Sequence, residues 1–411
     1  MVRPSWARAF AIAAFTTVFS GAASAQVAEV DLGSSLFWEP SPTSKLTVIT
    51  PHASVGVLPT DWLTIRAAWE ADIVSGATEA LKSGPYVDVM TEATPFSDTR
   101  HVATGTVALA RKDTRLAVSY SYGTEADYHS QAITVTAGTD FLQKNTQIEL
   151  AYAHGFDKVC TSAYRDDLAP SQRLAINSSS GCFTDAADRA SRDLALDNLQ
   201  AAWTQAWTPV LATQLVLTGA IQNGFLENPY REVVISSNGS SALENQPDNR
   251  ARIALAMRVK YHVRPIDTAF TLGVRGYRDT WDVVGQTYEL EAERYILPWL
   301  RVLARGRYYS QTGALFWSND YTAGEPVDGP RGQYWTGDRE LSPLKSYLLG
   351  GRVLTSWQGR PGARIIGAFL DLSASFGLDL MKTHLESFTW GDEKPTDTVA
   401  LIGVLNLGAA F

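Results

Sequence analysis

The sequence lacks most of the features that mark a helical membrane protein or an enzyme. Beyond the first 25 residues, no apolar run approaches the roughly 18 residues that a membrane-spanning helix requires. The six histidines are scattered, with no pair at the spacing of metal ligands. No P-loop, G-x-G-x-x-G or G-x-S-x-G motif is present. We therefore expect no enzymatic activity, no metal and no cofactor.

The N-terminus indicates export. Two arginines precede an apolar run from Ala9 to Phe19, and small residues follow up to Ala25. This is the pattern of a secretory signal peptide, with cleavage between Ala25 and Gln26. The remaining chain has no Pro/Ser-rich linker and no compositional shift. The sequence therefore predicts a signal peptide over residues 1–25 and a single domain over residues 26–411.

Positive charge and cysteine are both scarce. The 35 lysines and arginines are outnumbered by 43 aspartates and glutamates, and the resulting net charge of −8 argues against nucleic acid as a partner. The two cysteines, Cys160 and Cys182, fall within one expected loop, Gly155–Ser191. In an exported protein this pair predicts a disulfide, with two free thiols as the alternative.

The last fourteen residues, Thr398 to Phe411, alternate between two faces of an extended strand. Their length matches a tilted crossing of a bilayer. The bulkier, more apolar face carries Val399, Leu401, Gly403, Leu405, Leu407, Ala409 and Phe411. An amphipathic final strand with terminal Phe411 resembles the assembly signal of outer-membrane β-barrels, which implies the barrel assembly machinery as a partner. A soluble β-sandwich that ends on its last strand is the alternative.

Alternation with a period of two recurs along the chain, as over Leu63–Ile73 and Arg252–Val263. Short connections alternate with longer ones, as periplasmic turns and extracellular loops do in outer-membrane barrels. Short turns are expected at Leu58–Trp62, Lys112-Asp113, Pro209–Ala212, Arg264–Asp267, Leu297-Pro298 and Gly359–Gly362. Longer loops are expected at Ser75–Thr99, Gly155–Ser191, Gly224–Asn249, Gly313–Pro343 and His384–Asp397.

These patterns predict an all-β protein, a transmembrane antiparallel up-and-down β-barrel in the outer membrane of a Gram-negative bacterium. Counting back from Phe411, and beginning with Ala28–Trp38, gives about sixteen strands with both termini in the periplasm. Fourteen strands is the alternative, if the pair Thr114–Thr124 and Tyr128–Thr139 is misassigned. Outer-membrane lipid is then a necessary partner, and an oligomer is possible.

Tryptophans lie near several predicted strand ends, where an amphipathic ring favours the membrane interface. The candidates for such an aromatic girdle are Trp203, Trp207, Trp281, Trp299 and Trp357.

Charged residues on the less apolar face of each strand are expected to line a water-filled lumen, because an outward-facing charge would cost about 2–4 kcal/mol near the midplane. The predicted lining comprises Arg66, Glu70, Asp72, Arg252, Arg258, Lys260, Arg275, Glu289, Glu291, Glu293, Arg301, Arg305 and Arg307. Three glutamates on one strand lie between two strands that carry arginines. They form either a salt-bridge ladder that stiffens the wall or a field that orients polar solutes, and the two roles are compatible.

A pore or passive transporter for small polar solutes is the leading functional hypothesis. A non-conducting structural barrel whose loops bind partners is the alternative. An outer-membrane hydrolase comes third, with His129-Ser130 as the pair it could use. The long loops Gly155–Ser191 and Gly313–Pro343 could fold into the mouth or cover the outside, and the sequence does not decide between these.

Three short motifs carry a family resemblance. Asp72–Thr78 resembles the D-x-V-S-G-A-T/S element of an uncharacterised family of bacterial outer-membrane proteins, although Glu79 follows where that family has proline. Thr91–Pro95 and Asn228–Arg231 are similar to two further elements of that family. The resemblance implies an outer-membrane barrel and no particular activity. Physically, Ser75-Gly76 and Asn228-Pro229 each predict a turn.

Overall fold

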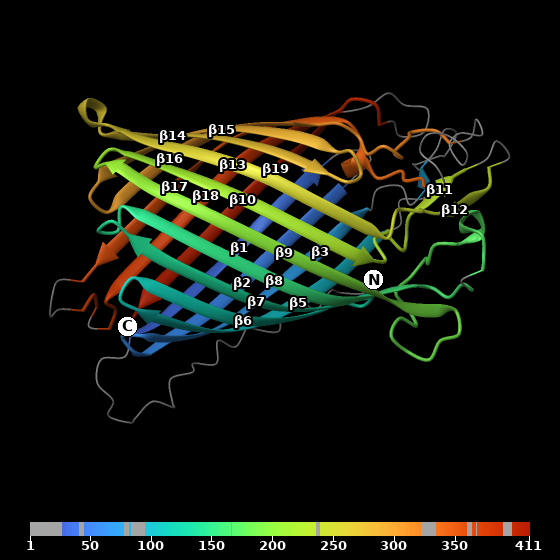
Figure 1. Cartoon of the computed structure of the whole chain (residues 1–411), viewed down its shortest axis with the longest axis horizontal. Coiled ribbons are helices and arrows are strands. Elements are labelled where there is room, and N and C mark those ends of the chain that lie inside the picture. The colour runs from blue at the N-terminus through green and yellow to red at the C-terminus, as the bar shows by residue number, and fades with distance from the viewer. Residues whose placement is uncertain are drawn as a thin grey trace, which may run out of the picture.

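The computed structural model describes residues 27–40, 45–77, 82–83, 95–165, 167–235, 239–321, 334–359, 364–366, 368–388 and 397–411. Within these residues, sixteen strands close into one barrel in the order β1-β19-β18-β17-β16-β15-β14-β13-β10-β9-β8-β7-β6-β5-β3-β2 (Figure 1). The predicted fold is thereby confirmed. The predicted signal peptide, its cleavage site and the segment Thr91–Thr94 lie outside the described residues.

The first eight barrel strands are β1 (Val27–Pro40), β2 (Lys45–Thr60), β3 (Leu63–Ala77), β5 (Pro95–Arg111), β6 (Thr114–Thr124), β7 (Tyr128–Phe141), β8 (Thr146–Ser162) and β9 (Arg189–Thr208). The other eight are β10 (Leu211–Gly224), β13 (Asn249–Val263), β14 (Thr268–Asp279), β15 (Val284–Leu297), β16 (Leu300–Gln311), β17 (Leu344–Gln358), β18 (Asp371–Leu385) and β19 (Thr398–Ala410). A separate three-stranded sheet contains β4 (Lys82–Ser83), β11 (Glu232–Val234) and β12 (Ser241–Leu243). Three short 3₁₀ helices are η1 (Pro170–Gln172), η2 (Arg264–Ile266) and η3 (Arg339–Leu341). No helix among these residues is long and apolar enough to cross a membrane.

The alternating sequence explains the wall. Residues paired across neighbouring strands point to the same face, so apolar residues of one strand lie beside apolar residues of the next. Leu32 of β1 pairs with Leu407 of β19, and Leu272 of β14 pairs with Leu290 of β15. These side chains are about half exposed because no other protein element covers them. The resulting apolar outer face is suited to contact with lipid.

The two ends of the barrel differ. Short turns, such as Asp61-Trp62 and Lys112-Asp113, join the strands at one end, and the longer connections gather at the other (Figure 1). The chain closes at the short-turn end, where the Phe411 amide donates a hydrogen bond to the Ala28 carbonyl at 2.9 Å. By the usual arrangement of such barrels, the short-turn end is periplasmic and the long-loop end is the extracellular mouth.

Two expectations about strand ends are wrong. β8 pairs with β9 from Thr146↔Gln205 to Ser162↔Arg189, so β8 runs well into the expected loop Gly155–Ser191, whereas β9 begins close to the end of that loop. Ser75 and Gly76 do not turn: they pair with Thr47 and Phe96 and extend β3. In both places the neighbouring strand supplies the backbone partners that continue the ladder.

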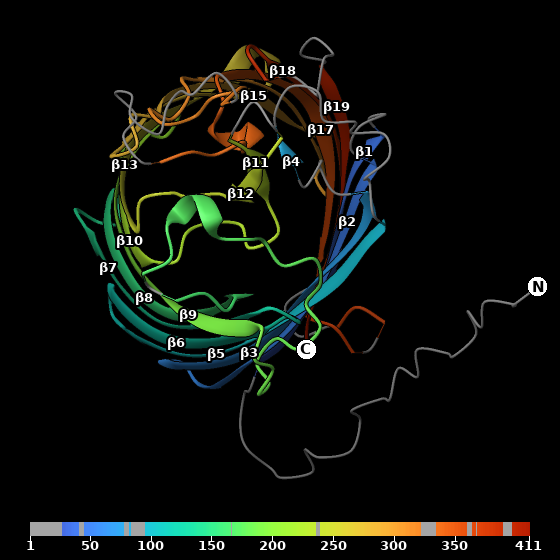
Figure 2. The same cartoon turned by 90° about the vertical axis from the view of Figure 1, so that its right-hand side faces the viewer.

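The long connections fold into the extracellular mouth. Viewed along the barrel, η1, β11, β12 and the connection after β16 lie within the ring of strands (Figure 2). We call the described parts of residues 163–188, 225–248 and 312–343 the mouth loops. They bury their own apolar clusters, one around Trp335 and Tyr321 and another around Phe316 and Leu341. The question that the sequence left open is thereby answered for the described residues.

The aromatic girdle has one exception. Trp203 and Trp207 meet edge to face, with ring centroids 6.1 Å apart. Trp299 and Trp357 stack at 6.0 Å near the periplasmic end. Trp281, however, is only 5% exposed and packs against Phe316 in the mouth. Its placement in the girdle was therefore wrong, because the connection after β14 turns inward instead of outward.

Candidate functional site: the charged inner wall

Contacts with the mouth loops identify the inner face of the barrel. Tyr277 of β14 and Leu196 of β9 both pack against clusters formed by these loops. Glu39 of β1 forms an ion pair with Arg339 of η3 at 3.1 Å. Because side chains alternate along a strand, each contact fixes the inner set of its whole strand.

Strand register carries this assignment to the three strands predicted to bear the charges. Arg275 lies two residues from Tyr277 on β14 and pairs with Thr287 of β15. Glu289, Glu291 and Glu293 follow on the same face of β15. Arg307 is opposite Glu289, and Arg305 is opposite Glu291. The register thus places these charges on the inner face.

Glu293 is the centre of the clearest ion-pair group. Lys260 Nζ lies 2.8 Å from one carboxylate oxygen and Arg301 Nη1 lies 2.7 Å from the other. Farther along β15, Glu289 has a looser contact of 3.9 Å with Arg258. Glu293 and Glu289 are therefore paired with cations from β13 and β16, as a cross-strand ladder requires.

Arg305 has a different partner from the one that the strand pattern suggested. Its guanidinium binds the carboxylate of Asp379 on β18, with Nε 2.9 Å from Oδ1. Asp379 is 1% exposed and pairs in register with Gly350 of β17. A Cβ at position 350 would lie 1.9 Å from Asp379 Oδ1, so glycine provides the gap through which the two side chains meet. Sequence reasoning missed Asp379, because its partner lies two strands away.

A second charged group lies on the far side of the barrel. Arg66 of β3 reaches Glu29 at 2.8 Å and Asp31 at 3.1 Å, both on β1. The two carboxylates were not predicted, although alternation in β1 places them on the same face as Glu39. Asp72 accepts a hydrogen bond from Thr50 at 2.8 Å. Glu70 pairs in register with His52.

Near the mouth, one buried carboxylate collects five hydrogen bonds. Asp279 accepts two from Arg250, one from the Tyr277 hydroxyl and one each from the Trp281 and Val283 amides. Arg252 lies opposite Asp279 in the register but forms no ion pair with it. The acceptor capacity of Asp279 is already used, and over the described residues Arg252 forms no ion pair.

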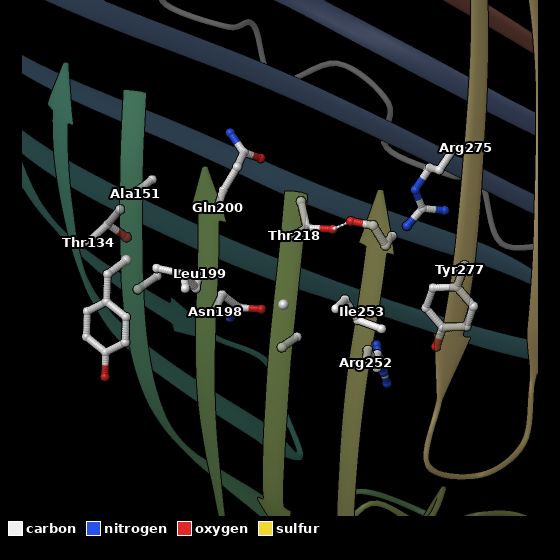
Figure 3. A pocket seen from close by; sticks show the side chains of 15 residues that line it. Thr134, Ala151, Asn198, Leu199, Gln200, Thr218, Arg252, Ile253, Arg275 and Tyr277 are labelled. Atoms are coloured by element: carbon white, nitrogen blue, oxygen red, sulfur yellow. Dashed lines mark hydrogen bonds between the residues drawn. The ribbon is translucent and has the colours of Figure 1, made fainter. Parts of the chain in front are cut away.

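Beside this carboxylate, the inner wall is hollowed over about 380 Å³. Small side chains, Ala151, Ala153, Ala220 and Ala254, form its floor. Figure 3 shows the polar groups around it: Asn198 and Gln200 of β9, Thr218 of β10, Arg252 of β13, and Arg275 with Tyr277 of β14. The Nε of Arg252 is buried without a hydrogen-bond partner. Alternation predicted the two arginines as lining residues, but nothing in the sequence marked the alanine floor.

Asn228–Arg231, one of the motifs behind the family resemblance, anchors a mouth loop to the wall. The turn forms as expected, with the Arg231 amide donating to the Asn228 carbonyl at 3.2 Å. The Tyr230 hydroxyl donates to Asp127, which lies in the turn between β6 and β7. Arg231 pairs with Asp338 at 3.0 Å and with Glu244 at 3.5 Å. The motif therefore ties two mouth loops and a hairpin together.

Glu244 is the most deeply buried of these acids. Its carboxylate accepts hydrogen bonds from the Thr336 hydroxyl at 2.7 Å and the Gly337 amide at 3.1 Å. Burial raises the pKa of Glu244 to about 7, and Asp338 adds to the rise while Arg231 opposes it. This group thus titrates near neutral pH within the mouth.

The predicted disulfide between Cys160 and Cys182 is confirmed, with Cα atoms 5.7 Å apart. Cys160 lies in β8, however, and only Cys182 belongs to a mouth loop. The bridge packs with Ile176, Phe183 and Tyr230. It therefore fastens a mouth loop to the wall instead of closing a free loop.

His129 and Ser130, the pair that a hydrolase could use, each make contacts of a structural kind. His129 stacks on Phe183 with ring centroids 4.0 Å apart. Ser130 accepts a hydrogen bond from Arg100 at 3.4 Å. Over the part of the chain that the structure describes, no group of three or more His, Cys, Asp or Glu side chains could hold a metal ion. The absence of catalytic activity stays a prediction.

Known structures share the fold at low sequence identity. A bacterial polysaccharide outer membrane secretin aligns with a TM-score of 0.50 and 10% identity, covering 93% of this chain and 98% of that one. The siderophore receptor PirA from Acinetobacter baumannii aligns at 0.44 and 10%, covering 92% and 60%. OprD from Pseudomonas aeruginosa aligns at 0.42 and 8%, covering 94% of each chain. No curated protein matches the sequence.

A closed barrel with an apolar outer face is one of the two architectures that can span a membrane. Together with the shared fold, this places the protein in the outer membrane, in contact with its lipid. The model of a family described as protein of unknown function (DUF3570) matches residues 7–354, which is most of the chain, and the protein therefore belongs to this family.

Proposed function

We propose that the protein is a pore or passive transporter for small polar solutes. The observation that carries the proposal is the inner wall, where cations and carboxylates from β13 to β18 face one another. A sixteen-stranded barrel is wide enough to contain water, and charged side chains on its inner face are stable only if they are hydrated or paired. Glu293 and Arg301 are each partly exposed as well as paired, as expected for residues beside water.

The contacts of the mouth loops define the route that such a solute takes. Ion pairs such as Arg339–Glu39 hold these loops against the wall. A solute from outside must therefore pass beside them before it reaches the charged strands. We propose that the mouth loops set the size limit of the pore and that the inner wall sets its charge preference.

A non-conducting barrel whose loops bind partners is the second candidate. The apolar clusters in the mouth favour it, because Trp335 at 2% and Tyr321 at 1% exposed are as buried as the side chains of a protein core. Such loops would present a stable surface to a partner while blocking the lumen.

Single-channel recording in planar bilayers separates the two candidates. Purified protein should give stable ohmic steps in potassium chloride if it is a pore. Persistent silence from protein that shows heat-modifiable migration on gels would reject the pore and support the blocked barrel. The heat-modifiability control is needed because unfolded protein is silent too.

A further inference from the structure

We propose that the hollow beside Asp279 binds the oxyanion group, a carboxylate or a phosphate, of a small solute. The solute body would rest on the alanine floor, and Arg252 and Arg275 would hold the anionic group. This proposal deepens the proposed function, on which it rests for the route by which the anion arrives.

The charge balance around the hollow carries the proposal. Arg252 and Arg275 both line the hollow, and the Asp279 carboxylate, opposite Arg252 in the register, is already paired with Arg250. Over the described residues, Arg275 contacts the Tyr277 ring but forms no ion pair. Two positive charges are therefore left without a carboxylate at one edge of the hollow. An unpaired guanidinium in a confined site favours an anion.

The hydrogen-bonding groups fit the same ligand. Arg252 is partly buried and its Nε has no acceptor, which is the kind of orphaned donor that a bound oxygen would satisfy. Asn198 and Gln200 add amide groups from β9, on the side of the hollow opposite Arg275 (Figure 3). Glu149, two residues before Ala151 on β8, is not among the residues that line the hollow.

The floor limits the size and polarity of the solute. Ala151, Ala153, Ala220 and Ala254 offer methyl groups where longer side chains would fill the space. A hollow of about 380 Å³ accommodates a compact organic acid or a small phosphate ester. Arginine binds carboxylate and phosphate with the same two-pronged geometry, so both anions belong to the proposed class.

Calorimetric titration of the folded protein in detergent tests the site without requiring conduction. The probes are succinate, inorganic phosphate and dimethyl succinate, the last of which has a similar shape but no charge. We expect binding of one or both anions and none of the diester. The Arg252→Gln/Arg275→Gln variant should bind at least about tenfold more weakly, because it loses two charge-assisted contacts.

Of two further variants, the first is a control and the second is an independent test of the site. Arg278→Gln removes an arginine that pairs with Asp282 on the outer face and should bind as the wild type does. Gln200→Ala leaves every charge in place and should weaken binding a few-fold, which covers the case in which the double variant does not fold. Equal affinity for succinate and its diester, or full affinity in the folded double variant, would overturn the proposal. If the protein conducts ions but binds neither anion, the anion site is rejected and the pore is not. If it binds an anion but gives no conductance, the pore is rejected and the site is not.

Discussion

The barrel wall and the mouth loops are held together by different kinds of interaction. In the wall, each strand bonds to its neighbours through the backbone, and its side chains alternate between lipid and the interior. In the mouth, stability comes from side chains that meet across long stretches of sequence, such as Arg339 with Glu39 and Tyr230 with Asp127. A repeated local pattern is therefore sufficient for the wall, whereas the mouth depends on specific pairs.

The wall and the mouth should also tolerate substitutions to different degrees. A wall position is constrained mainly by the face on which it lies, since the backbone ladder does not depend on side-chain identity. A mouth residue such as Glu244 is constrained by each partner that it touches, because a buried polar group without its partner is costly.

The largest effect is expected from a charge on the outer face of the wall. Leu272→Arg places a charge on a side chain that is 55% exposed toward the membrane. We expect the free energy of unfolding to fall by about 2–4 kcal/mol near the bilayer midplane. Urea titration of protein folded into lipid vesicles measures this loss of stability.

The neighbouring inner position provides the control. Thr271 lies between Lys260 and Glu291, and the substitution Thr271→Arg should lower the free energy of unfolding by less than about 1 kcal/mol. Equal losses would mean that the two faces are misassigned.

Removal of the disulfide should loosen the mouth and spare the wall. On the chain-entropy model, a bridge across this span contributes about 3 kcal/mol. The Cys160→Ser/Cys182→Ser variant should keep its heat-modifiable migration, while external protease cuts residues 163–188 faster than in the wild type. Reduction of the wild-type protein should reproduce the change. An unchanged cleavage rate would show that Tyr230 and its neighbours hold this loop without the bridge.

The inner charges of the wall should control ion selectivity. In the Glu289→Gln/Glu291→Gln/Glu293→Gln variant, Lys260, Arg301 and Arg258 lose their carboxylate partners. The reversal potential under a salt gradient should move toward anion preference, by a few-fold in permeability ratio for about 1 kcal/mol of interaction energy. The shift should shrink at 1 M salt, where the Debye length is about 3 Å.

Asp282→Asn, on the outer side of the rim, is the matched control for this selectivity change and should leave the reversal potential unchanged. If the triple variant conducts with the wild-type reversal potential, its charges lie off the permeation path. Loss of thermal stability in a silent barrel would instead indicate that the glutamates act only as struts.

The smallest effect should be a pH dependence confined to the mouth. Because burial raises the pKa of Glu244 to about 7, the closed mouth favours the neutral carboxyl. Its stability is therefore fully present at low pH and declines as the pH rises from the ordinary glutamate value toward 7. Hydrogen exchange of residues 334–341, corrected for the intrinsic effect of pH, should report more opening at pH 8 than at pH 5.

The substitution Glu244→Gln should remove this pH dependence, and Arg231 keeps Asp338 as its partner in the variant. Glu232→Gln, in the same loop, changes a carboxylate that accepts a hydrogen bond from Ser241 and serves as the control. Wild-type exchange that is flat between pH 5 and pH 8 would contradict the prediction.

Much of the wall was predictable from particular residues. The strand over Thr114–Thr124 has the expected bounds, and the alternation of Thr398–Phe411 places Leu401 and Leu407 opposite Trp38 and Leu32. The face of Glu289, Glu291 and Glu293 followed from their apolar neighbours, although a role in permeation stays a prediction. The end of β8 was not predictable, because polar sequence such as Asp157-Lys158 also suits a loop.

The ion-pair partners of the charged residues could not be predicted from the sequence pattern. Arg305 meets Asp379 only because Gly350 leaves a gap between them, and Trp281 turns inward only because Phe316 and its neighbours provide a cluster. The alanine floor of the hollow is unremarkable in each strand and forms a feature only when β8, β9, β10 and β13 lie side by side.

The barrel, the alternation of its faces and a count of about sixteen strands could be predicted from local periodicity and from the need of every backbone group in lipid for a partner. The disulfide was predicted for a different reason, because two cysteines fall within one expected loop of an exported chain. Only the folded structure shows which charges pair, that the long loops enter the mouth, and that Arg252 and Arg275 line one hollow without an ion pair among the described residues. These depend on side chains brought together from distant strands and loops, and no local pattern records that proximity.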